Sequence, residues 1–463
     1  DVERWTQQYG EFFRYKLGPQ KFLVVADPET INVVLRDRPA GFRRWHVASD
    51  IAREMLGSDG VFFAEGEAWE RQRRMVMSAF SPSQVRNYFP ALHKVVLRLQ
   101  GRWQKAALTG KPIALQADLM RYTVDGVAGL SFGIDVNTLE SDGGVIQHHL
   151  DKVFPMLQKR VLSLLPLWRY VKLPADRELD RSVAAVNKAI EGYITQARQR
   201  LQAEPGRSEQ PQNLIEAMLV AADQQGSGIH EQDMLANVWT LLLAGEDTTA
   251  NTLAWMIHLL HRHPDALQRA RDEVLRLAPD PSCYTPEVIA ELSYVEACAH
   301  EAMRLKPVAP FFAVEALRDT VLHGIEVPTG TQLLLVMRHH SIDPQHVAHG
   351  DAFDPDRWLI GEGGPADGHN THDGQSGPIN TPSGLKRVST PFGAGPRLCP
   401  GRYLALLEIK MAMAMLLSCF DIHSVQTPGG GEPDEELKFA MAPSALEMRI
   451  SARPLVQVMR DAP

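Results

Sequence analysis

Cysteine is scarce in this sequence, and the spacing of the few cysteines excludes several kinds of site. Only four occur in 463 residues, at Cys283, Cys298, Cys399 and Cys419, and none forms a closely spaced pair. A disulfide framework or a structural zinc site needs several cysteines at short, regular spacing. The cysteine content therefore favours a reducing compartment, and we expect the cytoplasm.

The sequence also lacks a long apolar run and an excess of positive charge. No uninterrupted stretch reaches the roughly 18 apolar residues that a membrane-spanning helix needs. The 48 Lys and Arg against 56 Asp and Glu give a net charge of -8, which argues against a nucleic-acid partner. A small or apolar substrate is favoured. The chain opens within an expected helix, so it leaves open whether a membrane anchor precedes Asp1.

The periodicity of apolar residues predicts a mostly α protein with small β-sheets. Residues 85–310 show the three- and four-residue spacing of helices almost throughout. Strand patterns are confined to a β-rich lobe at about 1–45 and to expected hairpins at 320–337 and 437–453.

Local signals define some boundaries more closely. Two strands are expected on either side of Gly18-Pro19-Gln20, and a helix after Asp27 with Pro28 at its first position. Residues 361–385 are rich in Gly, Pro, Asn and Asp, which predicts a flexible surface loop.

A long helix over 232–262 is apolar on nearly every side and would span roughly 45 Å. Its middle nevertheless carries Glu246, Asp247 and Thr248. One interpretation is a kink or polar stripe, with hydroxyls bonded to the carbonyl four residues back. The other is a small opening, bordered by Ala244 and Thr248 on one face, that delivers protons into an apolar site.

Glu301 and Arg304 are three residues apart on an expected helix and can form an ion pair. An exposed pair of this kind contributes little to stability. Arg357, within FDPDRW, offers a third charge. The alternative is therefore a buried three-member network that locks the fold.

Cys399 lies in PFGAGPRLCPGR, a stretch at 391–402 rich in glycine, proline and arginine. Pro400 suits the first turn of a helix, so Cys399 is expected at a helix N-terminus. The helix dipole, with Arg397 and Arg402 nearby, is expected to favour the thiolate over the thiol.

A thiolate in this loop could be a nucleophile or a metal ligand. A nucleophile would need a histidine base, and none of the 17 histidines falls close by or in a recognisable hydrolase pattern. A single thiolate cannot hold zinc or an iron–sulfur cluster, whereas haem iron accepts one.

Several motifs resemble those of the cytochrome P-450 superfamily, the haem-thiolate monooxygenases. FGAGPRLCPG resembles the cysteine loop of that family, and AGEDTT the oxygen-activation motif of its central helix. EAMR and FDPDRW resemble its Glu-x-x-Arg pair and the arginine partner, and WERQR a tryptophan and basic residue that contact the haem propionates. The motifs occur in family order from about residue 10 to the end. The resemblance implies one P-450 domain over 1–463, with the long helix above the haem.

The resemblance also implies roles for the matched residues. Cys399 would be the axial ligand of a b-type haem. Other residues near the cofactor would be Phe392, Gly393, Arg397, Trp69, Arg73 and Ala244, of which Arg397, Trp69 and Arg73 would bind the propionates. The catalytic set would be Glu246, Asp247 and Thr248, with the last two supplying protons during oxygen activation. Glu301, Arg304 and Arg357 would brace the fold.

One position departs from the family pattern. Many members carry a propionate-binding arginine in the strand after the Glu-x-x-Arg helix, where this chain has Val314. The surrounding APFFAVEALRDT is moderately similar to the corresponding segment of bacterial fatty-acid hydroxylases.

The same mapping predicts the walls of a substrate pocket. Besides residues 45–66 and the face of Ala244 and Thr248, they would be Val308, Phe311, Phe312 and the turn with Pro443. These mostly apolar walls favour a lipophilic substrate such as a fatty acid, terpenoid or steroid. The phenylalanines could instead be plain core.

The leading hypothesis is a monooxygenase that inserts one atom of O2 into a C–H or C=C bond. The chain shows no flavin or ferredoxin segment, so electrons would come from NAD(P)H through a separate partner, a ferredoxin with its reductase or a flavoprotein reductase. A monomer is expected. A haem-thiolate peroxygenase or isomerase and a haem sensor are alternatives, and Asp247 with Thr248 argues against both, because neither activity needs a proton supply for oxygen activation.

Overall fold

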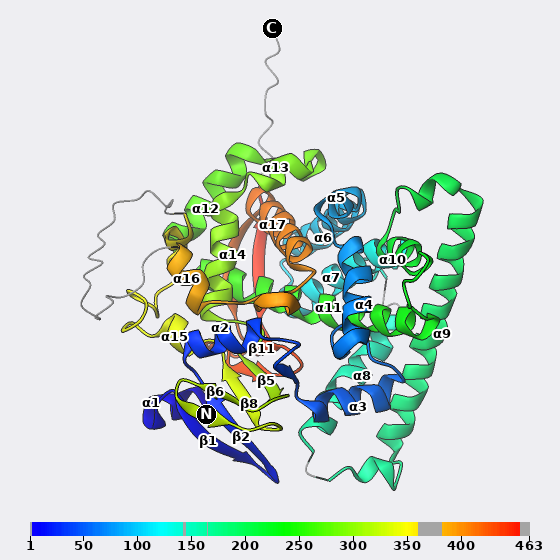
Figure 1. Ribbon diagram of the computed structural model, residues 1–463. Helices are drawn as coiled ribbons and strands as arrows, with labels where there is room; N and C mark the ends of the chain where they lie inside the picture. The colour runs from blue at the N-terminus through cyan, green and yellow to red at the C-terminus, as the bar shows by residue number, and fades with distance from the viewer. Residues whose placement is uncertain (1, 142–144, 164, 360–381, 454–463) are drawn as a thin grey trace.

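Helices form most of the molecule, and a β-rich region lies beside them, at the lower left of Figure 1. The computed structural model describes residues 2–453 apart from 142–144, 164 and 360–381. Its α-helices are α1 Val2–Tyr9, α2 Pro28–Arg36, α3 His46–Leu56, α4 Gly66–Ala79, α5 Pro82–Asn87, α6 Phe89–Thr109, α7 Leu115–Phe132, α8 Val145–Val161, α9 Pro174–Ala203, α10 Leu214–Ala222, α11 Glu231–Arg262, α12 Pro264–Leu277, α13 Pro286–Ala290, α14 Ser293–Leu305, α15 His339–Ile342, α16 Pro382–Val388 and α17 Arg402–Cys419.

The strands come mainly from the two ends of the chain, as the sequence predicts. They are β1 Phe12–Leu17, β2 Gln20–Val25, β3 Phe42–Arg44, β4 Ile113–Ala114, β5 Phe311–Ala316, β6 Thr320–Leu322, β7 Ile325–Val327, β8 Gln332–Val336, β9 Phe420–Gln426, β10 Glu435–Leu437, β11 Met441–Pro443 and β12 Glu447–Ala452. Short 3-10 turns include η4 Pro355–Trp358 and η5 Gly395–Arg397.

The main sheet has the order β1-β2-β8-β5-β3 and joins strands near the N-terminus to strands within residues 311–336. The predicted hairpin of β1 and β2 is confirmed, with Gly18 at a positive φ of 58° in the turn. Strand β2 runs parallel to β8, with Val24 opposite Leu334. The N-terminal strands are therefore held by a segment more than 300 residues later in the chain.

The predictions of hairpins over 320–337 and 437–453 are partly wrong. Within 320–337, only β6 and β7 pair as a hairpin, while β8 lies inside the main sheet. The physical reason is burial on both faces of β8, with Leu335 in one apolar cluster and Val336 in another. Within 437–453, β11 pairs with β10, and β12 pairs with the longer strand β9.

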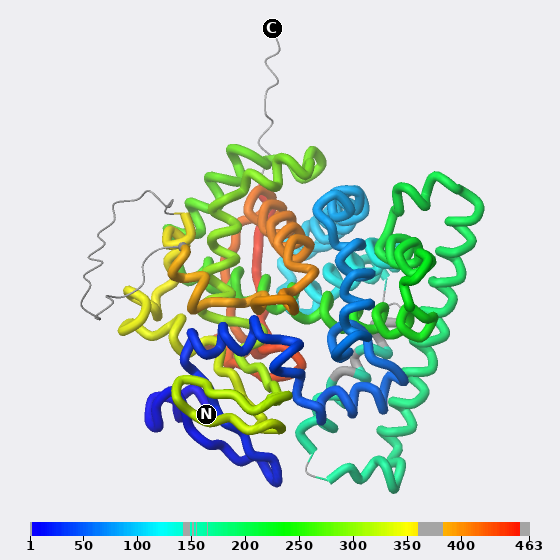
Figure 2. The backbone as a smooth tube through the Cα atoms, viewed as in Figure 1, coloured from blue at the N-terminus to red at the C-terminus, as the bar shows by residue number. Residues whose placement is uncertain are grey.

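Helix α11 confirms the long helix predicted at 232–262 and passes through the middle of the molecule (Figures 1 and 2). It packs against α7 and α14, and side chains on all its sides, such as Trp239, Leu253 and Trp255, are buried. A helix that is apolar all round is stable only inside a core.

Helix α2 begins as predicted after Asp27, whose carboxylate accepts a hydrogen bond from the Thr30 amide at 2.7 Å. The end of α2 packs on η5, within the cysteine loop. A Cβ on Gly395 would lie 2.7 Å from the Leu35 carbonyl oxygen, and its φ of 68° also favours glycine. This close approach fixes the loop against α2.

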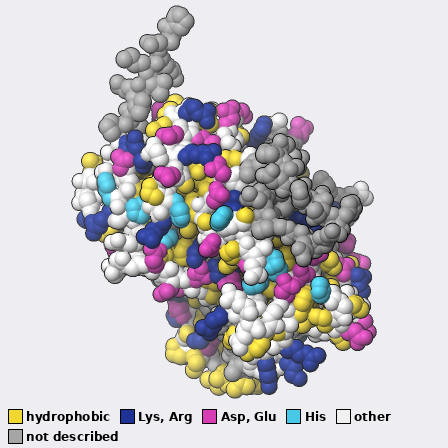
Figure 3. Space-filling model, turned by 90° about the vertical axis from the view of Figure 1, so that its left-hand side faces the viewer, with side chains coloured by type: hydrophobic (Ala, Val, Ile, Leu, Met, Phe, Trp, Pro, Cys, Tyr) yellow, Lys and Arg dark blue, Asp and Glu magenta, His cyan; other side chains and the backbone are white. Residues whose placement is uncertain are grey.

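The surface and the chain segments between elements add three observations. The loop predicted at 361–385 lies mostly outside the described residues, and its last four residues belong instead to α16. Among the described residues, no helix has the length and apolar character to cross a bilayer. Lysines and arginines are interspersed with acidic residues over much of the described surface visible in Figure 3.

Glu301 and Arg304 on α14 and Arg357 in η4 lie together in the core, each at most 2% exposed. The Arg304 guanidinium donates to both Glu301 oxygens, at 2.7 and 2.8 Å, and Arg357 Nε donates to Glu301 Oε1 at 3.3 Å. Trp358 also donates to this carboxylate, at 2.9 Å. The arginines use their remaining donors on main-chain carbonyls between 341 and 352. The ion pair therefore belongs to a buried network and not to the surface.

Replacing Arg304 with alanine should lower the free energy of unfolding by about 3–5 kcal/mol, because the Glu301 charge loses its main partner in the core. Chemical denaturation of the purified variant measures this loss. Arg181→Ala is the matched control, since Arg181 pairs with Glu178 at the same spacing but is 75% exposed. A loss for Arg304→Ala as small as that of the control would contradict the buried network.

Candidate active site

A cavity of about 320 Å³ lies among α11, α17 and the loop that carries Cys399. Its size is at the lower end of the usual range for small-molecule sites. Helix α11 contributes a row of small and hydroxyl side chains, including Ala244, Gly245 and Thr248. The cysteine loop contributes Phe392, Gly393, Ala394, Arg397 and Cys399. The structure thus brings together the two motifs that are about 150 residues apart in the sequence.

Cys399 lines the cavity, and its loop is held by the Cys399 amide, which donates to the Phe392 carbonyl at 2.9 Å. Helix α17 begins only at Arg402, so Pro400 precedes the helix and does not lie in its first turn as predicted. Burial raises the pKa of the Cys399 thiol, although the amides of Gly401 and Arg402 and the charges of Arg73 and Arg402 oppose this effect. The expectation that the protein alone favours the thiolate is therefore wrong, because desolvation outweighs the dipole and the arginines.

The other three cysteines lie elsewhere among the described residues. Cys283 is exposed, Cys298 is buried within α14, and Cys419 ends α17, where its sulfur accepts a hydrogen bond from Gln100 at 3.3 Å. None of these three lines the cavity. All four cysteines are free thiols.

The expected cofactor residues Trp69, Arg73 and Arg397 also line the cavity. The Arg397 guanidinium lies 4.6 Å from the centre of the Trp69 ring, pairs with Glu65 and donates to the Ala64 carbonyl at 2.7 Å. Arg73 donates to the Leu398 carbonyl at 2.5 Å, next to Cys399. These contacts orient both arginines at the cavity.

Sequence reasoning missed two further arginines at the cavity, Arg38 and Arg44. Arg44 ends β3 and lies opposite Val314 in the sheet register. A guanidinium therefore reaches the cavity from the strand beside the position where the family arginine was expected. The repeated arginines of RPAGFRR were the available signal, but only the pairing of β3 with β5 shows which way they point.

The arginines at this end of the cavity outnumber their acidic partners. Arg38 is 3% exposed, and neither its Nε nor its Nη2 has a hydrogen-bond acceptor among the described residues; the same holds for Nε of Arg397. Burial and the nearby Arg397 lower the pKa of Arg38 to about 9. Glu65 is the acidic partner, with 4.0 Å between its carboxylate and Arg38. The polypeptide therefore leaves buried guanidinium donors suited to additional carboxylates.

Comparison with known proteins identifies the chain. The Cytochrome P450 family model matches residues 1–450. The chain belongs to the cytochrome P450 family.

Among its relatives, this P450 is 28% identical to carotene epsilon-monooxygenase of Arabidopsis thaliana over 91% of its length and 76% of the relative's. It is 28% identical to cyclooctat-9-en-7-ol 5-monooxygenase of Streptomyces melanosporofaciens, covering 90% and 83% of the two chains. The crystal structure of the haem domain of cytochrome P450DA superposes with a TM-score of 0.82 at 25% identity, covering 97% of this chain and 91% of the other. The chain has the P450 fold and is a P450 monooxygenase.

Membership of this family implies haem held by an axial cysteine thiolate, and the residues present fit that group. Haem carries two carboxylates, which match the unpartnered donors of Arg38 and Arg397. Cys399 lines the same cavity, and the many apolar residues of its lining suit the flat face of a macrocycle.

Only some of the residues predicted to line the substrate pocket do line the cavity, and on β5 this follows from side chains that face opposite sides of the sheet in turn. Val308 and Phe312 line the cavity, together with Val61 and Phe62 of the predicted segment 45–66. Phe311 points to the other face of the sheet, into the apolar cluster of Val24, Ala26 and Val336, because successive side chains of a strand face opposite sides. Pro443 belongs to β11 and is not among the residues that line the cavity.

The AGEDTT motif lies in an unbroken stretch of α11 and shows the hydroxyl-to-carbonyl bond of the first interpretation. The Thr248 hydroxyl donates to the Ala244 carbonyl at 2.7 Å and also lines the cavity. Glu246 is buried, and neither Glu246 nor Asp247 is among the residues that line the cavity. A Cβ on Gly245 would lie 2.6 Å from Val127 of α7, so this glycine allows the two helices to pack closely.

Glu408 on α17 is an acidic residue at the cavity that the motif analysis did not single out. It is 2% exposed, and its Oε1 has no hydrogen-bond partner among the described residues. Burial raises the pKa of its carboxyl to about 8. The group is therefore mainly protonated at neutral pH, which avoids a buried, uncompensated charge.

The raised pKa of Glu408 predicts a specific dependence of stability on pH. Between about pH 5 and about pH 8 the unfolded chain loses this proton while the folded protein keeps it, so folding becomes less favourable as the pH rises. Glu408→Gln cannot titrate, and its stability relative to the wild type should increase by about 1.4 kcal/mol per pH unit across this range. Unfolding curves for both proteins at several pH values measure the difference. A difference independent of pH would contradict the raised pKa.

Proposed function

We propose that Cys399 is the axial ligand of the haem iron and that the cavity above it is the oxygenation site. The supporting observation is that Cys399 is the cysteine that lines the cavity in the part of the chain that the structure describes. Burial raises the pKa of the free Cys399 thiol. Binding to a metal cation would overcome this effect, because a thiol that coordinates a metal is deprotonated. The amides of Gly401 and Arg402 and the charge of Arg73 would then support the thiolate.

The haem carboxylates are assigned to the arginine side of the cavity. Arg397, Arg73 and Trp69 remain the proposed contacts, and Arg38 and Arg44 add two cations that replace the arginine missing at Val314. Charge-assisted hydrogen bonds of this kind are short and strong inside a low-dielectric site. Phe392, Gly393 and Ala244 would border the macrocycle, since all three line the same cavity.

When bound, the haem supplies the activation of O2 for insertion of one oxygen atom into a C–H or C=C bond of a lipophilic substrate. Electrons are proposed to come from NAD(P)H through a separate ferredoxin system or flavoprotein reductase. The expected monomeric state and cytoplasmic location remain part of this proposal, and the free thiols support a reducing compartment.

The walls of the cavity and the named relatives support a terpenoid among the lipophilic substrates. Val61, Phe62, Leu241, Val308 and Phe312 offer apolar surface without charge. Two relatives are named for carotene and for cyclooctat-9-en-7-ol, both terpenoids. Spectral titrations with matched panels of terpenoids, fatty acids and steroids test this preference, and binding confined to fatty acids would refute it.

Thr248 is proposed to hold and pass protons at the cavity. Its hydroxyl is part-buried and bonded to the Ala244 carbonyl, so the oxygen is oriented yet keeps its acceptor capacity toward the cavity. Asp247 is the adjacent proposed source of protons, and Glu246 lies further into the core. General acid catalysis requires such a group within hydrogen-bond reach of the reacting atom.

The first test concerns the ligand. Purified protein should carry one b-type haem, and its reduced carbon monoxide complex should show the red-shifted Soret band of thiolate ligation. Cys399→Ala should abolish that band, whereas Cys419→Ala, at a buried cysteine away from the cavity, should retain it. Retention of the band in Cys399→Ala, or its loss only in Cys419→Ala, would refute the assignment.

The second test concerns Thr248. In Thr248→Ala the haem content, thiolate spectrum and substrate binding should stay near wild type, because alanine favours the helix at least as well as threonine does. Oxygenated product per NAD(P)H consumed should fall, and release of hydrogen peroxide should rise. Thr248→Ser keeps the hydroxyl and should restore most of the coupling. Unchanged coupling in the alanine variant would remove Thr248 from the proposed mechanism.

A further inference from the structure

A second cluster of metal-binding side chains lies away from the haem cavity. Glu11 precedes β1, His340 is on the short helix α15, and His346 is in the turn that follows α15. One ligand atom from each residue lies within 4.8 Å of the other two. None of the three lines the cavity with Cys399.

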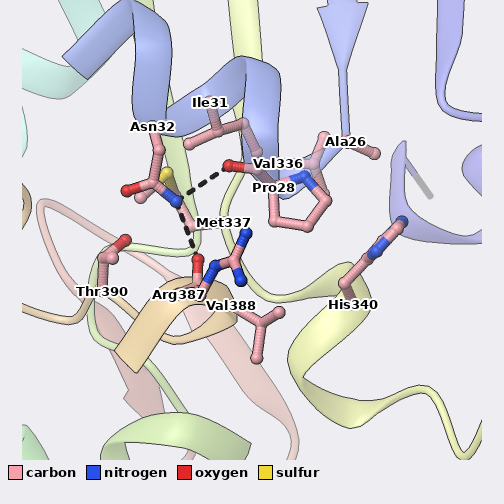
Figure 4. A pocket seen from close by; sticks show the side chains of 10 residues that line it. All are labelled: Ala26, Pro28, Ile31, Asn32, Val336, Met337, His340, Arg387, Val388 and Thr390. Carbon is pink, nitrogen blue, oxygen red and sulfur yellow. Dashed lines mark hydrogen bonds between the residues drawn. The ribbon is translucent and has the colours of Figure 1, made fainter. Parts of the chain in front are cut away.

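His340 provides the strongest reason to consider a ligand here. It is 6% exposed, and its Nε2 lies 2.5 Å from Glu11 Oε1 but in a direction that makes no hydrogen bond. In Figure 4 its imidazole stands at the edge of a small pocket, apart from Asn32 and Arg387, which bond to each other through the Arg387 carbonyl. The buried Nε2 of His340 and the Glu11 carboxylate are therefore close together without a hydrogen bond between them.

The neighbouring His346 argues against a simple ion pair as the reason why His340 lies so close to Glu11. The His340 and His346 rings stack with 3.8 Å between their centres and an angle of 16° between their planes. Two imidazoles stacked this closely would repel each other if both were protonated, which disfavours a fully charged contact between His340 and Glu11. A neutral imidazole is the form of histidine that binds metals.

We propose that Glu11, His340 and His346 form a binding site for a divalent transition-metal ion, with Zn²⁺ as the ion that fits best. Two imidazoles and one carboxylate are donors that zinc prefers, and zinc commonly keeps a water molecule as the fourth ligand. Zinc–ligand distances of about 2.0–2.2 Å bring tetrahedral ligand atoms to roughly 3.4 Å from one another. The pair at 2.5 Å must open slightly, and His346 must tilt out of the stack. His346 lies in a turn and is only partly buried, so this tilt needs no change in the core.

The site would connect the N-terminal segment to α15. That connection already has two polar contacts, since Arg338 pairs with Glu3 and the Thr6 hydroxyl lies 3.0 Å from His339 Nδ1. Arg304 donates to the Ser341 carbonyl, directly after His340. A bound ion would therefore fasten the start of β1 to the segment that the buried Glu301 network holds, and would stabilise the folded protein by an amount that rises with the logarithm of its affinity.

The experiment uses the haem-loaded protein, treated with a chelator and then titrated with zinc sulfate alone. Equilibrium dialysis with metal analysis should show one zinc ion per chain, and zinc should raise the melting temperature. Glu11→Gln and His346→Ala change partly exposed ligands and should each weaken zinc binding by at least about tenfold. Both should also lose the zinc-dependent rise in melting temperature. His423→Ala, at an exposed histidine of β9, is the control that should bind zinc as the wild type does.

X-ray absorption at the zinc edge supplies a readout independent of the haem. The wild type should show two imidazole nitrogens and oxygen ligands at zinc distances. Absence of stoichiometric binding by the wild type would overturn the proposal. So would zinc binding that survives both Glu11→Gln and His346→Ala unchanged, because the ion would then lie elsewhere on the surface.

Discussion

The buried carboxylate of Glu301 imposes the constraint on which much of this structure depends. A charge in the core is tolerated only when its oxygens are fully used, and here two arginines, an indole N–H and the amide of Asp354 converge on it. The arginines in turn hold a carbonyl of α15 and the carbonyls of a segment with little regular structure between α15 and η4. One ion pair on α14 thus positions a stretch of chain that could not position itself through a sheet or a long helix.

The cavity differs from this network, because the polypeptide supplies fewer acidic groups there than arginines. Arg38, Arg44 and Arg397 approach one carboxylate, Glu65, and burial lowers the pKa of each guanidinium. Such an arrangement costs folding free energy unless an anionic group joins it. The haem carboxylates are the anionic groups proposed to join these arginines.

Helix α11 combines core packing with a face that lines the cavity. Its buried sides hold it against α7 and α14, and Gly245 lets α7 approach closely. The face that meets the cavity carries threonines, three of which, Thr240, Thr248 and Thr252, bond to carbonyls of their own helix. Hydroxyls satisfied in this way can lie in an apolar interior without a large penalty and still offer an oxygen to the cavity.

The sequence alone determined the helical class, the hairpin of β1 and β2, the long helix α11 and the family, because these follow from periodicity, turn residues and short motifs. It also indicated Cys399, since a lone cysteine among glycines and arginines has few chemical uses. Only the tertiary structure decided which strands β8 joins and that Phe311 faces away from the cavity while Phe312 lines it. It also decided that Arg38 and Arg44 line the cavity. It alone brought Glu11 to His340 and His346, which lie more than 300 residues later in the chain. These features depend on register and long-range pairing, which the order of residues leaves open because each strand has two faces and several possible partners.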